Sequence, residues 1–250
     1  AGLNTDSVER KALDALGWQP KLFTDQPMDF TQVNNWQERL LNYYENNGHP
    51  FATILLDSLQ INDDKVTAAL KANKGPAYVI DSIRIFGDAK ISNLFLQRYL
   101  DITNGSLFSK EKLLRISRKI LELSYIQEEK RHDISYLGSG SVLNLYLKPR
   151  KSSQVNVLIG FLPNNDQLSS KKLLLTGEAN INLKNAFGNG ETIGLNWQQL
   201  QVKSPRLNLL YRHPYIFNSP AGLDLAFDIF RKDSTFLNIY FNIGAQYAFS

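Results

Sequence analysis

Alternation of apolar and polar residues dominates the chain after residue 153, and this feature most restricts the possible fold. In residues 173–184, Leu, Gly, Ala and Ile at odd positions alternate with Thr, Glu, Asn and Lys at most even positions. A period of two places the two sets on opposite faces of a β-strand. A second such segment, residues 192–199, follows the turn-forming residues 185–190. The sequence therefore predicts a β-hairpin with one apolar and one polar face.

The same alternation recurs in residues 154–161, 207–212, 223–230 and 237–249. Together these segments predict about six strands, each near the roughly 9–11 residues with which a β-strand crosses a membrane. Two interpretations are open. In a membrane barrel the apolar set faces lipid and the polar set faces a wet lumen, whereas in a soluble sandwich the apolar set faces a core. We favour the barrel because of the length and phase of all the strands together. Short turns at 185–190 and 218–222 and a long polar loop at 163–172 also suit its two rims.

Composition excludes several other classes of protein and of functional site. The longest apolar runs are far shorter than the roughly 18 residues of a membrane-spanning helix. Cysteine is absent, which excludes disulfides, thiolate metal sites and cysteine nucleophiles, and a net charge of +4 does not indicate nucleic-acid binding. The chain opens without Met, so we expect a mature exported chain or a piece of a longer one. About six strands are fewer than the roughly 8 of the smallest membrane barrels, so we expect the barrel to be incomplete here.

Residues before 150 predict two α+β units. In the first we expect helices at 7–16 and from an N-cap at Thr31 to Asn47, with Val33, Trp36 and Leu40 on one face, then strands at 51–59 and 65–72. In the second we expect a strand at 78–86, a helix at 91–100, a helix capped by Ser109, and a hairpin of 125–136 and 142–147. The domain division that we predict is 1–74, 75–149 and 150–250.

The second unit carries a family resemblance. The run from Ala77 to Gly87 (AYVIDSIRIFG), then Leu100 to Phe108 (LDITNGSLF) and a Leu-rich helix, resembles the POTRA domain. POTRA domains stand in the periplasm before the barrel of outer-membrane assembly proteins of the BamA and TamA type. Residues 31–74 resemble the second half of a preceding, partial POTRA domain, and residues 182–191 and 213–217 resemble the opening hairpins of the barrel. The resemblance implies α+β POTRA domains followed by an antiparallel transmembrane β-barrel in the outer membrane of a Gram-negative bacterium.

The same resemblance implies two places where a client strand could pair. The second POTRA strand lies at a sheet edge, where strand addition would use the segment containing Tyr125, Gln127, Glu129, Arg131, Asp133 and Ser135. An edge that is solvated or covered by a neighbouring domain is the alternative. The first barrel strand forms a lateral gate in this family, and it corresponds here to Gln154, Val155, Asn156, Val157, Leu158, Ile159, Gly160 and Phe161.

The function that the resemblance implies is assembly and insertion of outer-membrane proteins. Its partners would be unfolded outer-membrane proteins, outer-membrane lipid and accessory assembly proteins, with no nucleic acid. A POTRA-bearing secretion pore for a dedicated partner is a second hypothesis, since a polar lumen suits both roles. A soluble periplasmic β-rich binding protein is a third.

No pattern of catalytic residues stands out. His49, His132 and His213 lack metal-ligand spacing, and the sequence from Gly188 to Gly190 fits a hairpin turn better than a dinucleotide site. Glu178, Asp224 and Asp228 are expected as lumen-facing polar groups on alternating strands. Lys148, Arg150 and Lys151 form a solvated linker or meet lipid headgroups, and we favour the linker. We therefore expect no catalytic residues, no metal, no cofactor and no enzymatic activity.

Overall fold

A computed structural model describes residues 2–24, 26–63, 65–138, 140–163, 173–199, 204–233 and 235–247. The expected loop after Pro163 and the last three residues lie outside these ranges. Within the described ranges three sheets carry the fold, with strand orders β1-β3-β2, β5-β4-β7-β6 and β13-β12-β11-β10-β9-β8. In the described ranges no helix is both long and apolar enough to cross a membrane.

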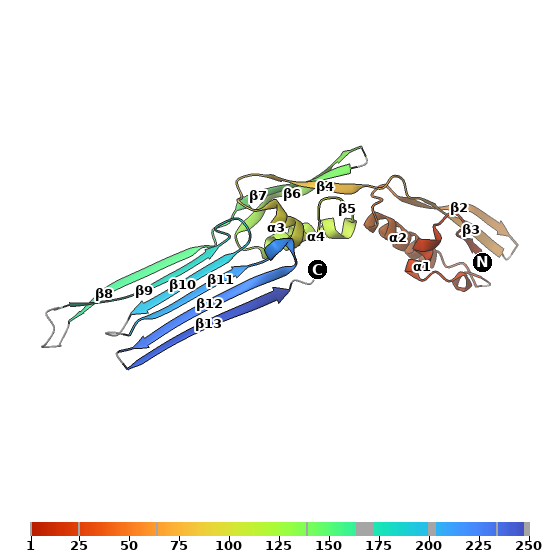
Figure 1. Cartoon of the computed structure of the whole chain (residues 1–250). Helices are drawn as coiled ribbons and strands as arrows, with labels where there is room; N and C mark the ends of the chain where they lie inside the picture. The colour runs from red at the N-terminus through yellow and green to blue at the C-terminus, as the bar shows by residue number, and fades with distance from the viewer. Residues whose placement is uncertain are drawn as a thin grey trace. The chain divides into compact units, whose positions relative to one another are not determined.

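The first α+β module consists of β1 (Gly2–Asn4), α1 (Arg10–Leu16), a 3-10 turn (Pro20–Leu22), α2 (Phe30–Asn46), β2 (Thr53–Asn62) and β3 (Lys65–Asn73). Figure 1 shows both helices against one face of its sheet. Val33, Trp36, Leu40 and Tyr44 are buried along one side of α2, as their spacing predicts. They pack with Ala12 and Leu70 in a single apolar core.

Both helices of this module begin at residues other than those predicted from the sequence. Asp29, and not Thr31, is the N-cap of α2, because its carboxylate accepts hydrogen bonds from the backbone N–H groups of Thr31 (2.8 Å) and Gln32 (3.4 Å). Helix α1 begins at Arg10 instead of Ser7, whose hydroxyl donates to the carbonyl of Leu70 in β3 (2.6 Å). Local sequence offers several capping residues, and tertiary contacts decide which of them caps.

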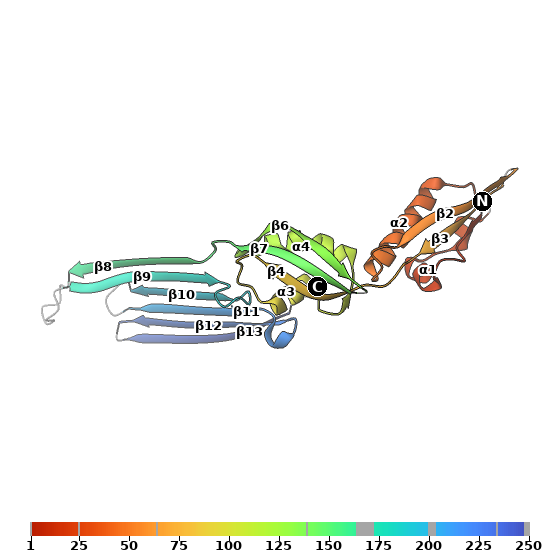
Figure 2. The same ribbon diagram turned by 90° about the horizontal axis from the view of Figure 1, so that it is seen from above.

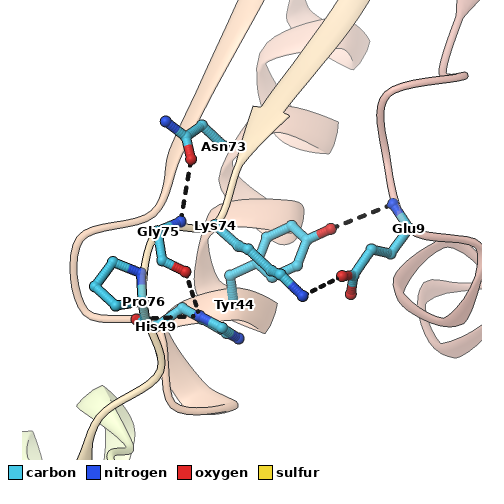
Figure 3. Close-up of polar contacts among 7 residues, drawn as sticks. All are labelled: Glu9, Tyr44, His49, Asn73, Lys74, Gly75 and Pro76. Atoms are coloured by element: carbon cyan, nitrogen blue, oxygen red, sulfur yellow. Dashed lines mark hydrogen bonds and ion pairs between the residues drawn. The ribbon is translucent and has the colours of Figure 1, made fainter. Parts of the chain in front are cut away.

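A polar network closes the end of the first module (Figure 3). The Tyr44 hydroxyl accepts from the backbone N–H of Glu9 (3.4 Å), and the Glu9 carboxylate pairs with Lys74. His49 Nδ1 lies 3.2 Å from the carbonyl oxygen of Gly75 and 3.3 Å from that of Pro76. Carbonyls only accept, so this nitrogen carries the proton and ties the end of α2 to the residues before β4. His49 is thus structural, as the sequence indicates.

The second module has the same order of elements. It contains β4 (Val79–Phe86), α3 (Asn93–Leu100), β5 (Ser106–Leu107), α4 (Lys110–Glu122), β6 (Ile126–Leu137) and β7 (Gly140–Pro149). Leu113, Ile116 and Ile120 recur at helical spacing on one side of α4, and with Leu123 just after it they are at most 9% exposed. In each module the first strand (β1 or β4) pairs with the last strand (β3 or β7), which also pairs with the strand before it (β2 or β6). The strand before the last, β2 or β6, therefore lies at a sheet edge. The sequence indicated only the second half of such a unit before residue 74, whereas β1 supplies a three-residue first strand.

Six antiparallel strands follow, joined as successive neighbours (Figure 2). They are β8 (Gln154–Pro163), β9 (Leu173–Lys184), β10 (Thr192–Gln199), β11 (Arg206–His213), β12 (Ala221–Lys232) and β13 (Phe236–Tyr247), with a 3-10 turn (Ile216–Asn218) between β11 and β12. Each strand that the alternation predicts is present. The α+β modules followed by part of an antiparallel barrel sheet confirm the predicted fold class.

By backbone packing the chain forms two compact units, and their division passes through the second module. One unit holds residues up to 83, 103–116 and 133–144. The other holds residues 84–102, 117–132 and everything from 145 onward. Helix α3 and the first half of β6 therefore belong with the six-stranded sheet, whereas residues 133–137 of β6 belong to the first unit.

Candidate functional site

The six-stranded sheet has one apolar face that no described core covers. Every buried apolar side chain of the described residues precedes residue 148. On β8 and β13 the apolar side chains are between 58% and 66% exposed at Val155, Val157, Ile159, Phe161, Leu237, Ile239, Phe241 and Ile243. Proteins in water rarely expose a contiguous apolar surface of more than a few hundred Å². These side chains are not meshed in a dry sandwich interior, so the face requires an apolar environment.

The opposite face carries a row of amides and acids. Asn156, Asn180, Asn196, Asn208 and Asp228 are directly opposite one another across five strands, so they share a face. The Asn196 amide donates to Asn180, and the Asn208 amide donates to Asp228. A hollow of about 520 Å³ opens above this row. The sheet therefore has a wettable face that is already organised by hydrogen bonds between strands.

The other acids expected on this face also lie there. Asp224 accepts from the Gln246 amide (2.6 Å) and lies 3.7 Å from the Arg212 guanidinium, and Glu178 is opposite Gln198. His213, at the end of β11, contacts the Tyr211 hydroxyl through Nδ1 (3.0 Å). His132 in β6 lies 3.1 Å from the Glu128 carboxylate. The side chains of Asp224, His213 and His132 are therefore each held by a neighbouring side chain.

Strand β8 is one edge of the six-stranded sheet, and β13 is the other. All eight residues expected to form a gate, Gln154 through Phe161, lie in β8 and pair with residues 175–182 of β9 on one side. An edge strand presents unpaired N–H and C=O groups on its other side, where an extended segment can add. Among the described strands, this side of β8 therefore has no partner strand, and an extended segment could add to it.

Strand β6 is an edge of the four-stranded sheet, as the resemblance implies. Gln127, Glu129, Arg131, Asp133 and Ser135 lie within it, whereas Tyr125 precedes it. The side chains of Asp133 and Ser135 already accept hydrogen bonds from the buried Asn144 amide, at 2.7 and 2.9 Å. The Tyr125 carbonyl accepts from the backbone N–H of Arg150 (2.9 Å). What β6 offers an incoming strand is thus its outer backbone edge from residue 126 on.

The turn between β9 and β10, residues 185–191, is built around a buried acid that sequence reasoning missed. Glu191 is fully buried, and its carboxylate accepts hydrogen bonds from the backbone N–H groups of Phe187 and Asn189, the second at 2.9 Å. The Asn185 side chain accepts from the N–H of Gly190 (2.9 Å). Backbone N–H donors can hold a buried carboxylate in place of water. We call residues 185–191 the docked turn.

The docked turn is fastened to the segment before α3. The Asn185 amide donates to the Lys90 carbonyl (2.8 Å), and the N–H of Ser92 donates to the Gly188 carbonyl (2.6 Å). Ser92 also caps α3. A Cβ on Gly190 would lie 2.3 Å from the Phe95 ring, and this glycine has φ of +75°. Glycine at this position is therefore required by both backbone conformation and space.

Aromatic side chains surround the docked turn. The Phe95 ring stacks on Tyr99 at 5.6 Å and meets Tyr215 edge-on at 5.7 Å. The Tyr125 hydroxyl lies against Gly190, since a Cβ there would be 2.9 Å away. Burial raises the pKa of Tyr125, and the nearby Glu191 carboxylate raises the pKa further. Ring packing and the hydrogen bonds to Lys90 and Ser92 therefore both attach the docked turn to the segment that leads into α3.

Comparison with known proteins supports the fold. Neither a family model nor a curated protein matches the sequence. BamA from Haemophilus ducreyi lacking POTRA domains 1–3 aligns over 97% of this chain with a TM-score of 0.57 and 16% identity. Two further structures are more distant. CdiB from Acinetobacter baumannii aligns over 98% of this chain and 47% of its own, with a TM-score of 0.48 and 15% identity. The POTRA 3–5 structure of Haemophilus influenzae BamA aligns over 59% of this chain and 65% of its own, with a TM-score of 0.41 and 19% identity. The chain spans 45% of the Haemophilus ducreyi BamA structure.

Proposed function

We propose that this chain is the periplasmic and first barrel part of an outer-membrane protein that assembles and inserts other β-barrel proteins. The premise is the fold, which consists of two modules of POTRA-like topology followed by barrel strands and is shared with BamA over 97% of the chain. The observation that carries the proposal is the pair of faces on an open sheet, one exposed and apolar, the other polar and hydrogen-bonded. Hydrocarbon would contact the first face and water the second.

The role that we propose needs strand pairing and no bond-making chemistry. An unfolded outer-membrane protein would first add to the edge of β6 and then to the edge of β8. In lipid an unpaired backbone group costs several kcal/mol. An opened edge at β8 would therefore favour pairing with any strand that arrives. Accessory assembly proteins and outer-membrane lipid would be the further partners.

Depletion of the complete protein in its own cell tests this function. We expect many unrelated barrel proteins to be lost from the outer membrane together, because one insertion site serves them all. The measurement is quantitative proteomics of the detergent-extracted outer membrane during depletion. Loss of one exported protein from the medium, with barrel proteins unchanged, would contradict assembly and identify a secretion pore instead.

Proline on β6 tests the first docking edge. Proline removes a backbone N–H, and an edge strand tolerates it where that N–H faces outward. One of two double variants, Glu129→Pro with Arg131→Pro or Lys130→Pro with His132→Pro, should leave the fold intact and remove two outward donors. At about 1 kcal/mol per hydrogen bond we expect binding of an unfolded barrel protein to weaken by about tenfold or more.

The matched control replaces the same residues with alanine, which keeps both N–H groups. Affinity is measured by fluorescence anisotropy of a labelled, urea-diluted barrel protein, and folding by circular dichroism. Equal affinity of the folded proline and alanine variants would show that β6 is not the docking edge.

A further inference from the structure

A basic cavity of about 410 Å³ lies beside the docked turn, within the unit that holds the six-stranded sheet. Lys90, Arg150, Lys151 and Lys184 line it, together with one acid, Asp88. The four cations come from three separate parts of the chain: the segment before α3, the connection from β7 to β8, and the end of β9. The fold brings them together, which a solvated linker alone would not do.

The charges in this cavity are unbalanced. In the ranges that the structure describes, no carboxylate forms an ion pair with Lys90, Arg150, Lys151 or Lys184. Lys184 Nζ instead donates to the Thr192 hydroxyl (3.2 Å). With Asp88 as the one acid of the lining, the cavity carries an excess of three positive charges. Such an excess attracts anions and disfavours a metal cation.

Neutral donors complete the lining. Ser152 and Ser153 also line the cavity, as does Asn185, whose amide keeps one N–H beyond the one it donates to the Lys90 carbonyl. The Ser153 oxygen accepts from the backbone N–H of Lys184 (3.0 Å), which leaves its own hydrogen available to donate. Arginine and lysine with hydroxyl donors on one concave surface are the groups that recognise phosphate oxygens.

The place of the cavity along the strands indicates the source of the phosphate. The lining ends at Ser153, and β8 begins at the next residue. The first apolar side chain of β8, Val155, is 60% exposed. The cavity therefore lies at the rim where the exposed apolar face of the sheet begins. In the membrane orientation of the proposed function, on which this step rests, that rim is the depth at which lipid headgroups meet hydrocarbon.

We propose that this cavity binds a phosphate ester, with the headgroup of an anionic phospholipid as the source that its position favours and a soluble phosphate compound as the other. The site does not depend on which protein the chain inserts or exports. If the cavity binds no phosphate ester, the expected outcome of the depletion experiment is unchanged. A bound headgroup would bridge the segment before α3, the docked turn and the connection that leads into β8, and would fix the edge strand relative to the bilayer surface.

Native mass spectrometry of the complete protein in detergent micelles tests the proposal. The probes are phosphatidylglycerol, phosphatidylcholine and inorganic phosphate, each titrated separately. We expect one phosphatidylglycerol to bind about tenfold or more tightly than phosphatidylcholine, because net negative charge adds to the phosphate contacts. The variant Lys90→Gln with Arg150→Gln should lose this preference, since it removes two lining charges whose side chains carry no hydrogen bond of the docked turn.

The matched control is Lys148→Gln with Lys232→Gln, which removes two charges outside the cavity. It should bind phosphatidylglycerol within about twofold of the unmodified protein, because screened surface charges contribute little to a specific site. Equal weakening in both double variants, or no preference for phosphatidylglycerol over phosphatidylcholine, would overturn the lipid assignment. Displacement of bound phosphatidylglycerol by equimolar inorganic phosphate would support the phosphate site and identify its ligand as soluble.

Discussion

Replacing Phe227 with arginine should destabilise the folded protein in phospholipid vesicles by about 2–4 kcal/mol. Phe227 lies in the middle of β12, opposite Leu209 and Phe241, on the apolar face. If lipid contacts this face, the guanidinium must either enter hydrocarbon or draw water and headgroups toward it, and both are costly. The free energy of unfolding is measured from urea titrations of the complete protein refolded into vesicles.

The neighbouring residue provides the control. Ala226 is on the same strand but on the opposite face, where it lines the polar hollow. Ala226→Arg adds the same side chain to a wet surface, so we expect a change of less than about 1 kcal/mol. A larger loss for Ala226→Arg than for Phe227→Arg would mean that the polar face is the dry one, and the proposed membrane orientation would be wrong.

The strands were predictable because the information that forms them is local. A period of two fixes which face each side chain occupies, and every alternating segment within the described ranges is a strand in the predicted phase. The face of α4 was predictable for the same reason, at a period of 3.6. The short β1 was not, because three residues carry no measurable period and pair only through contacts with Thr67, Ala68 and Ala69.

The burial of Glu191 in the docked turn could not be predicted from the sequence. Asn185 and Gly188 to Gly190 indicate a tight turn, and the structure confirms that a turn is present there. The turn that contains the buried Glu191 is bonded to a segment 95 residues earlier in the chain, through Asn185 and Lys90. An acid that follows two glycines in a hairpin turn was the available signal, but by itself it fits an exposed residue equally well. Which residues approach the turn is decided by the fold of the whole second unit.

The cavity beside this turn was missed for a related reason. Arg150 and Lys151 stand in a short polar connection that resembles any solvated linker. They become part of a basic cavity only because the fold brings Lys90 and Lys184 beside them from distant positions in the sequence. A count of charges along the sequence cannot register such convergence, because each cation is separated from the others by ordinary mixed sequence.

The second large effect is expected at Glu191. In Glu191→Ala the N–H groups of Phe187 and Asn189 lose a charged acceptor in a buried site. Hydrogen bonds to charged groups are worth about 1.5–3 kcal/mol each, so we expect the docked turn to open more easily by about 3 kcal/mol. That corresponds to roughly hundredfold faster amide exchange at these two residues. Hydrogen–deuterium exchange with fragment-resolved mass spectrometry measures this rate.

Two further variants test whether faster exchange is specific to release of the docked turn or follows from the loss of any carboxylate. Glu178→Ala removes a carboxylate from the polar face of β9 and should leave exchange at Phe187 and Asn189 unchanged. Gly190→Ala keeps Glu191 but places a Cβ against the Phe95 ring at a positive φ, so it should also speed exchange at the turn. If Glu191→Ala and Gly190→Ala both left the turn protected, neither the carboxylate nor the close packing would fasten it to α3.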